Sequence, residues 1–231
     1  ALKNAGFNSV RIPVRWYTGV DTKLKGVKED VDLAIAQGPA VIINYHHYEP
    51  MHKAAEQYPG GNYPSEKQNY LSAWKRVAQT FASYPANKLV FEIYNEPRGI
   101  SQAAVDDLML SAYEVIRAAA PNHTIMFEGN GYAKFAQIPN LDLPADGNII
   151  VTGHYYDPYT FTHQGHGDAY NCNANANDGI SAMAGHFKSY ADSIAVYFPD
   201  VNGGSVPMNM GEFGVANKGT CRSISDAKRE A

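Results

Sequence analysis

Short apolar segments rich in Val, Ile and Phe alternate along the chain with longer segments whose apolar residues recur at helical spacing. We predict six strands, which begin near residues 8, 40, 88, 123, 148 and 206. The main predicted helices lie between them, at residues 27–38, 65–84, 103–120 and 180–198. Apolar strands separated by helices are typical of a parallel sheet covered by helices. The sequence therefore predicts an α/β fold.

Polar and charged residues gather where at least five of these strands end, and no glycine-rich phosphate-binding loop follows the first strand. In a (β/α)8 barrel the carboxyl ends of the strands surround one mouth, whereas a doubly wound sheet binds nucleotides at a glycine-rich turn. The pattern favours the barrel. We predict a single catalytic domain, residues 1–231, built as a (β/α)8 TIM barrel in which about six βα units, strands 2 to 7, are evident.

The chain has 231 residues, begins in what reads as the last turn of a helix, ALKNAG, and ends within another helix, SISDAKREA. A complete barrel of eight such units is longer, typically about 250 residues or more. Six strands cannot close with the usual tilt and would leave two sheet edges exposed. We interpret the chain as a gene fragment, incomplete at both ends. The alternative is that another chain supplies the missing units; otherwise we expect a monomer.

Net charge is −4 and only 18% of residues are charged, so neither nucleic acid nor a membrane surface is an expected partner. Aromatic residues make up 12% of the chain and include 16 Tyr, which fits polysaccharide binding. We expect a secreted protein whose signal peptide is not part of this chain. Cys172 and Cys221 form no metal-binding pattern, and whether they form a disulfide is left open. We expect no metal and no cofactor.

Two carboxylates occupy matching positions at predicted strand ends. The strand in LVFEIYNEPRG ends at Asn95 and Glu96, and the strand in VPMNMGEFG ends at Glu212. Alternation along the strand in LVFEIYNEPRG places Glu92, Tyr94 and Glu96 on one face. Glu92 lies one layer deeper, which indicates a structural role. About three βα units separate Glu96 from Glu212, so we expect them to face each other across the barrel mouth.

Two carboxylates that flank one bond are what glycoside hydrolysis requires, because one protonates the leaving oxygen while the other attacks the anomeric carbon or activates a water. Arg11, at another strand end, can hold one carboxylate ionised and lower its pKa. His46 and His154, also at strand ends, can donate hydrogen bonds to sugar hydroxyls or carboxylates. A lone histidine is more often structural, but this set together indicates a glycosidase site.

Five blocks, in the order GFNSVRIPVRW, VIINYHHYE, FEIYNEP, HYYDPYTFTHQG and GEFG, carry a resemblance to a known family. The chain resembles the bacterial endo-β-1,4-glucanases (cellulases) of glycoside hydrolase family 5, clan A. The resemblance implies a (β/α)8 barrel that hydrolyses cellulose and related β-glucans by a retaining mechanism. In that mechanism Glu96 is the general acid/base and Glu212 the nucleophile.

The resemblance also implies roles around the cleavage subsite for Arg11, His46, Asn95, His154 and Tyr156. Asn95 corresponds to the residue that binds the sugar 2-hydroxyl, and Tyr156 to the residue bonded to the nucleophile. His47 matches only a branch of the family with a doubled histidine, and is interpreted as substrate-binding.

The family's first strand and its last strand, which carries a tryptophan under the cleavage subsite, have no counterpart in this chain. Candidates for stacking on sugars are therefore Trp16, Tyr48, Tyr63, Tyr132, Tyr159 and Phe161. Of these we favour Trp16 and Phe161, and helical spacing assigns Trp74 to the core. Two alternatives stay open: a β-mannanase, xyloglucanase or licheninase of the same family, and a non-catalytic glucan-binding barrel.

Overall fold

The computed structural model describes residues 3–157, 159–163, 177–197 and 206–214. Within them the chain forms six strands, which confirms the predicted number and order: β1 (Ser9–Val14), β2 (Ala40–Tyr45), β3 (Leu89–Glu92), β4 (Thr124–Glu128), β5 (Ile149–Tyr155) and β6 (Met208–Phe213). All neighbouring pairs are parallel, and the order in the sheet is the order in the sequence. This is the arrangement of consecutive strands in a (β/α)8 barrel.

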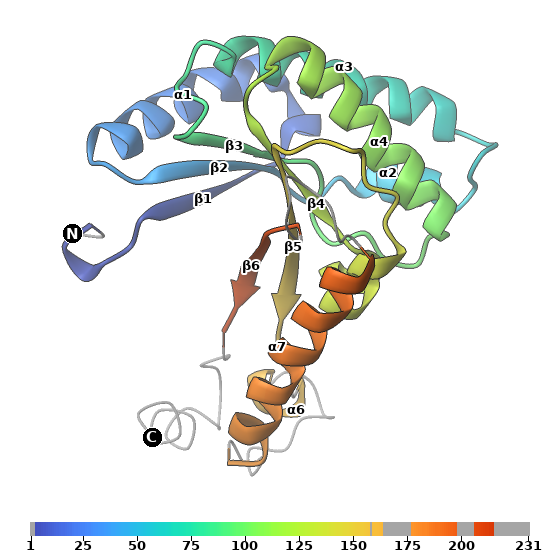
Figure 1. Cartoon of the computed structure of the whole chain (residues 1–231). Coiled ribbons are helices and arrows are strands. Elements are labelled where there is room, and N and C mark those ends of the chain that lie inside the picture. Colours follow the sequence, from blue (N-terminus) through green and yellow to red (C-terminus); the bar gives the residue numbers. More distant parts are fainter. Residues whose placement is uncertain (1–2, 158, 164–176, 198–205, 215–231) are drawn as a thin grey trace.

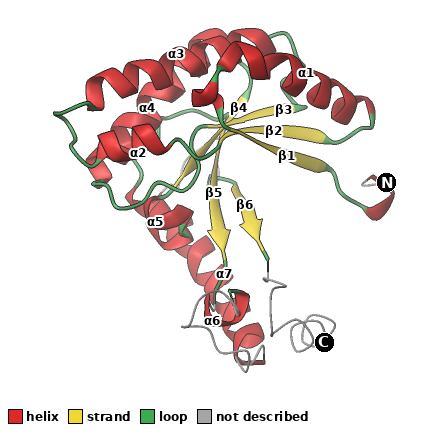
Figure 2. Cartoon of the chain, turned by 180° about the vertical axis from the view of Figure 1, so that it is seen from behind, coloured by secondary structure: helices red, strands yellow, loops and turns green. Residues whose placement is uncertain are grey.

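Helices follow the strands and lie along the outer side of the sheet (Figures 1 and 2). The α-helices are α1 (Val20–Ala36), α2 (Glu49–Ala55), α3 (Tyr63–Phe81), α4 (Gln102–Ala119), α5 (Asn130–Ala133), α6 (Tyr159–Thr162) and α7 (Asn177–Tyr197). Three short 3₁₀ segments are η1 (Lys3–Ala5), η2 (Trp16–Thr18) and η3 (Phe135–Asn140). Helix α1 begins earlier than predicted. Its N-cap, Gly19, provides no side-chain hydrogen bond, so the usual signal of a helix start is missing.

The strands bury apolar side chains toward the helices and polar ones on the inner face. Phe91 packs against Trp74 of α3, and Phe127 packs against Tyr113 of α4. The residues that follow, Glu92 and Glu128, are fully buried on the opposite face. Because side chains alternate along a strand, the apolar layer and the polar interior arise from the same short segments. The inner face of the sheet therefore carries charged side chains.

Strand β3 ends in a fixed but irregular segment. The carbonyl of Ile93 accepts hydrogen bonds from Tyr70 Oη at 2.8 Å and from Trp74 Nε1 at 3.0 Å, so Trp74 belongs to the core as predicted. Tyr94 packs edge-on against Tyr70 of α3, with ring centroids 5.9 Å apart. The prediction that Tyr94 shares a face with Glu92 is therefore wrong. Regular alternation stops at Glu92, where β3 ends.

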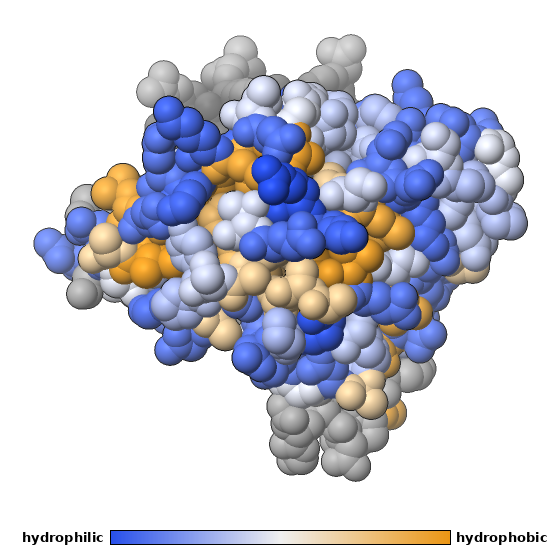
Figure 3. All heavy atoms as spheres, turned by 90° about the horizontal axis from the view of Figure 1, so that it is seen from above, coloured by the Kyte–Doolittle hydropathy of each residue, from blue (hydrophilic) through white to orange (hydrophobic). Residues whose placement is uncertain are grey.

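The sheet curls until its two edges meet through side chains. Strands β1 and β6 are the first and last in the sheet, yet Arg11 Nη1 of β1 lies 2.7 Å from Glu212 Oε1 of β6. The six strands thus form part of a barrel around a polar interior. Seen from the helix-covered side, the surface is mostly hydrophilic, with smaller apolar areas between (Figure 3). Among the described residues, no helix is long and apolar enough to span a membrane.

The two hydrogen bonds to the Ile93 carbonyl lead to a prediction about stability. Tyr70→Phe removes one of two donors and should cost about 1 kcal/mol, because the carbonyl keeps Trp74 Nε1. In Tyr70→Phe/Trp74→Phe the buried carbonyl has neither donor, so the double variant should lose about 1 kcal/mol or more beyond the sum of the single variants. Urea unfolding of all four proteins measures this coupling. Additive losses would contradict the shared anchor.

Candidate active site

Arg11 is the centre of the polar interior. Its Nε and Nη2 atoms donate to the two oxygens of Glu92, at 2.6 and 3.0 Å. Nη2 also donates to Asn95 Oδ1 at 2.9 Å, and Nη1 donates to Glu212 Oε1 at 2.7 Å. Burial acts to lower the pKa of Arg11, but the surrounding carboxylates, Glu92 first among them, outweigh it and raise that pKa. The guanidinium is permanently charged and orients three side chains at once.

Glu212 receives a donor on each carboxylate oxygen. Arg11 contacts Oε1, and Tyr156 Oη donates to Oε2 at 3.1 Å. Burial acts to raise the pKa of Glu212, but the charges of His154 and Arg11 and these two hydrogen bonds outweigh it, so the pKa is lowered. The same contact also affects Tyr156. Burial and the neighbouring Glu212 raise the pKa of Tyr156 to about 12. Glu212 is therefore held as a carboxylate and Tyr156 as a neutral donor.

A β-bulge turns Glu212 toward this cluster. The pairing of β5 with β6 shifts at Gly153/His154, so that His154 lies opposite Glu212 and Gly211 is the extra residue. A Cβ at Gly211 would lie 2.8 Å from Thr152 Oγ1 and 3.0 Å from His154 Nε2. Glycine at this position lets β6 approach β5 closely enough for Glu212 to reach Arg11.

Glu96 lies beyond the end of β3, in a left-handed backbone conformation with φ of 55°. Its Oε1 lies 2.7 Å from His154 Nδ1. One carboxylate oxygen of Glu96, one of Glu212 and a ring nitrogen of His154 all lie within 4.8 Å of one another. Glu96 and Glu212 side chains keep 21% and 25% of their exposure, so both can reach a substrate. The buried Glu92 cannot, in line with the structural role predicted for it.

The two adjacent histidines differ. His46 Nδ1 is 2.9 Å from Asn44 Oδ1, and burial, His47 and Arg11 lower the pKa of His46 to about 4. His46 is therefore neutral near pH 7 and can donate or accept a hydrogen bond. His47 is exposed, with φ of 49°, and its ring meets that of His46 edge-on at 4.1 Å.

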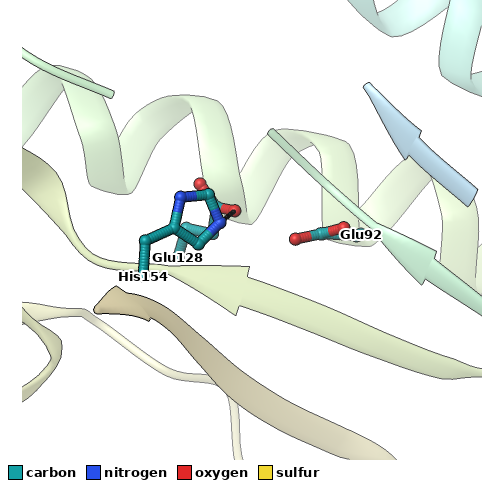
Figure 4. A group of neighbouring side chains, drawn as sticks. All are labelled: Glu92, Glu128 and His154. Atoms are coloured by element: carbon teal, nitrogen blue, oxygen red, sulfur yellow. Dashed lines mark ion pairs between the residues drawn. The ribbon is translucent and has the colours of Figure 1, made fainter. Parts of the chain in front are cut away.

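Glu128, at the end of β4, belongs to the cluster but was not singled out from the sequence. Its Oε2 accepts the backbone N–H of Glu96 at 2.6 Å, and its Oε1 faces His154 Nε2 at 3.5 Å (Figure 4). Burial, followed by the charge of Glu92, raises the pKa of Glu128 well above its usual range. The segment TIMFEG ends a strand in Glu as FEIYNE does, and that parallel was the available signal.

Two groups of side chains have the spacing of cation ligands: Glu92, Glu128 and His154, and Glu96, His154 and Glu212. Arg11 already supplies positive charge to both, because it binds Glu92 and Glu212 directly. The guanidinium thus offsets part of the negative charge of both groups.

The aromatic residues predicted to stack on sugars are placed very differently. Trp16 is fully buried in η2, and Tyr48 and Tyr63 are buried as well. A ring with no exposed face cannot stack on a ligand, so this position does not fit the role predicted for Trp16. Tyr132 is 55% exposed and its backbone N–H donates to Pro97 O, next to Glu96. The side chain of Phe161 lies outside the described part of the chain, as do Cys172 and Cys221.

The parallel strand order is that of a (β/α)8 barrel, and two partly exposed carboxylates, Glu96 and Glu212, lie close together at the carboxyl end of the sheet. A sequence model of the cellulase family (glycosyl hydrolase family 5) matches residues 1–230, and the chain belongs to this family. Endoglucanase H of Acetivibrio thermocellus is 32% identical over 176 residues, which are 72% of this chain and 19% of that protein.

Among solved structures, Thermotoga maritima Cel5A in complex with mannotriose matches with a TM-score of 0.77 and 31% identity, over 92% of this chain and 70% of that one. Cel5A in complex with cellobiose matches with a TM-score of 0.72 and 31% identity, over 85% and 65%. The chain spans 19% to 63% of the length of eight curated endoglucanases that it matches.

The bulge at Gly211 can be tested directly. Gly211→Ala should displace His154 or β6, because the added Cβ would lie 2.8 Å from the Thr152 side-chain oxygen and 3.0 Å from the His154 ring. We expect a loss of hydrolytic activity of about 100-fold, since an error of about 1 Å in a catalytic group has that effect. Gly214→Ala is the matched control, because a Cβ there meets nothing within 4 Å. Equal activity of the two variants would contradict the close approach.

The lowered pKa of Glu212 predicts a pH-dependent contribution to stability. A group whose pKa falls on folding stabilises the protein above its unfolded pKa and loses that contribution as pH drops through the folded value. Wild type should therefore be more stable than Glu212→Gln at pH 7, and the difference should shrink below about pH 4, near the usual pKa of Glu. Urea unfolding across this range measures it. A stability difference between the two proteins that grows as the pH falls would contradict a lowered pKa of Glu212.

Proposed function

We propose that the protein is an endo-β-1,4-glucanase that hydrolyses internal bonds of cellulose and related β-glucans with retention of configuration. One observation carries this proposal: carboxylate oxygens of Glu96 and Glu212 lie within 4.8 Å of each other. Retaining glycosidases hold their two carboxyl groups about 5 to 5.5 Å apart, whereas inverting enzymes leave room for a water at about 6.5 to 9.5 Å. The short separation favours direct attack by one carboxylate.

In the first step, Glu212 attacks the anomeric carbon while Glu96 donates its proton to the leaving glycosidic oxygen. The carbon–oxygen bond to the leaving sugar breaks, and an ester bond to Glu212 forms. The lowered pKa of Glu212 suits the nucleophile, because it keeps that carboxylate ionised while Glu96 carries a proton. Tyr156 and Arg11 fix the attacking group.

In the second step, Glu96, now a carboxylate, takes a proton from a water molecule. That water attacks the anomeric carbon, and the ester bond to Glu212 breaks. Two displacements at one carbon return the original configuration. His154, 2.7 Å from Glu96, supports a role in orienting that carboxylate for both proton transfers. We assign the binding of the sugar 2-hydroxyl to Asn95, and its hydrogen bond from Arg11 supports this role.

The substrate class is proposed from the relatives. Curated relatives are named endoglucanases, and Cel5A has been solved with cellobiose and with mannotriose. The mannotriose complex favours one second candidate, a β-mannanase using the same carboxylates. Because polymeric glucans do not cross membranes, we propose that the enzyme acts outside the cell.

The test of this function is the configuration of the first product. Proton NMR early in the hydrolysis of cello- and manno-oligosaccharides should show the β-anomer before mutarotation. Glu212→Gln should abolish turnover, and Glu96→Ala should lose about 10²- to 10⁴-fold on substrates that need an acid. Azide should restore turnover of Glu96→Ala on an activated aryl glycoside, with β-glycosyl azide as product.

An α-anomer as first product would exclude Glu212 as nucleophile. Equal near-zero hydrolysis by wild type and Glu212→Gln, with retained binding of cello-oligosaccharides, would instead support a non-catalytic glucan-binding barrel. Faster hydrolysis of mannans than of glucans would assign the enzyme to the second candidate.

A further inference from the structure

We propose that Glu128 is a positioning residue for the acid/base carboxyl of Glu96, which it holds through the Glu96 backbone and through His154. The catalytic part of this inference rests on the proposed function. Glu128 is fully buried and therefore acts through other residues and not on the substrate. It comes from β4, the neighbour of β3, and Glu96 lies just beyond the end of β3.

The first contact is with the backbone. Glu128 Oε2 accepts the N–H of Glu96 at 2.6 Å. Glu96 has φ of 55°, a left-handed conformation that non-glycine residues adopt only at a cost and that surrounding contacts must maintain. The Glu128 carboxyl can maintain this backbone conformation, because it binds the amide of Glu96 itself. Without this acceptor, the Glu96 N–H would lose its partner.

The second contact is with the histidine that binds the side chain of Glu96. His154 Nδ1 lies 2.7 Å from Glu96 Oε1, while its Nε2 faces Glu128 Oε1 at 3.5 Å (Figure 4). These two facing atoms, His154 Nε2 and Glu128 Oε1, are buried and have no hydrogen-bond partner among the described residues. At 3.5 Å the two atoms have the spacing of an ion pair but form no hydrogen bond. Glu128 therefore limits both ends of Glu96, the amide directly and the carboxyl through the imidazole.

The charges around Glu128 identify its best substitute. Facing groups are Arg11 of β1, Glu92 of β3, Glu96 beyond β3 and His154 of β5. Burial and the charge of Glu92 raise the pKa of Glu128, which favours the neutral carboxylic acid. A neutral amide of the same shape keeps the carbonyl acceptor for the Glu96 N–H. Glu128→Gln should thus preserve the positioning, and Glu128→Ala should remove it.

Kinetics with two substrates that differ in leaving group distinguish misplacement of the Glu96 acid from general damage to the site. Dinitrophenyl β-cellobioside has a leaving group that departs without a proton, whereas cellotetraose needs one. In Glu128→Ala, kcat/KM should fall about 100-fold on cellotetraose, the lower part of what a general acid contributes, and less than about 10-fold on the aryl glycoside. Glu128→Gln should stay within about 5-fold of wild type on both. Equal losses on the two substrates in Glu128→Ala would overturn the proposal.

Hydrogen exchange provides a readout independent of activity. The Glu96 amide should be protected in wild type and in Glu128→Gln, and should exchange faster in Glu128→Ala. Asp107→Ala is the control: it removes a carboxylate that binds Lys67 and Tyr63 at the helical layer and should change neither the Glu96 exchange nor the leaving-group dependence. Unchanged exchange in Glu128→Ala would overturn the proposal. If wild type cleaves neither substrate, the proposed function fails, and the exchange comparison still decides whether Glu128 holds Glu96.

Discussion

The guanidinium of Arg11 is the interaction on which the site depends. It joins β1 to β3 through Glu92, to the loop after β3 through Asn95, and to β6 through Glu212. Because β1 and β6 are the two ends of the strand order, one side chain bridges the edges of the curved sheet. A buried charge of this kind is stable only with its partners in place, and removal of one partner is strongly destabilising. The curvature of the sheet and the geometry of the site are therefore set together.

Carboxyl groups of one chemical type acquire different properties around this cation. Glu212 has its pKa lowered and keeps partial exposure, whereas Glu128 has its pKa raised by complete burial beside Glu92. Depth in the barrel decides the outcome, since desolvation opposes ionisation most where no water remains. The outer carboxyls can perform chemistry and the inner ones can support it. This division follows from strand direction, because the site lies at the carboxyl ends and the support one layer below.

Much of this could be predicted from the sequence. Strand ends in a parallel βα fold converge, so Arg11, Asn95, Glu96, His154 and Glu212 could be grouped before any geometry was known. Tyr94 and Trp16 were misjudged, because alternation fails where β3 ends and because a residue after a strand can turn into the core as well as toward the mouth. The ending of TIMFEG in Glu, like that of FEIYNE, indicates that Glu128 lies near the site, but its contact with the backbone N–H of Glu96 cannot be predicted from any sequence pattern.

Glu96, the proposed acid/base, is also held from the helical side of the sheet. Ile93, three residues before Glu96, is fixed by Tyr70 and Trp74 of α3, while Glu128 binds Glu96 from the interior. The strained turn between these anchors cannot relax without breaking one of them. The proposed retaining mechanism requires that Glu96 and Glu212 keep a separation of about 5 Å through two steps with opposite proton transfers. Anchors on the helical and inner sides of the segment after β3 fix the position of Glu96 relative to β4 and α3, whereas Arg11 and Tyr156 hold Glu212 on β6.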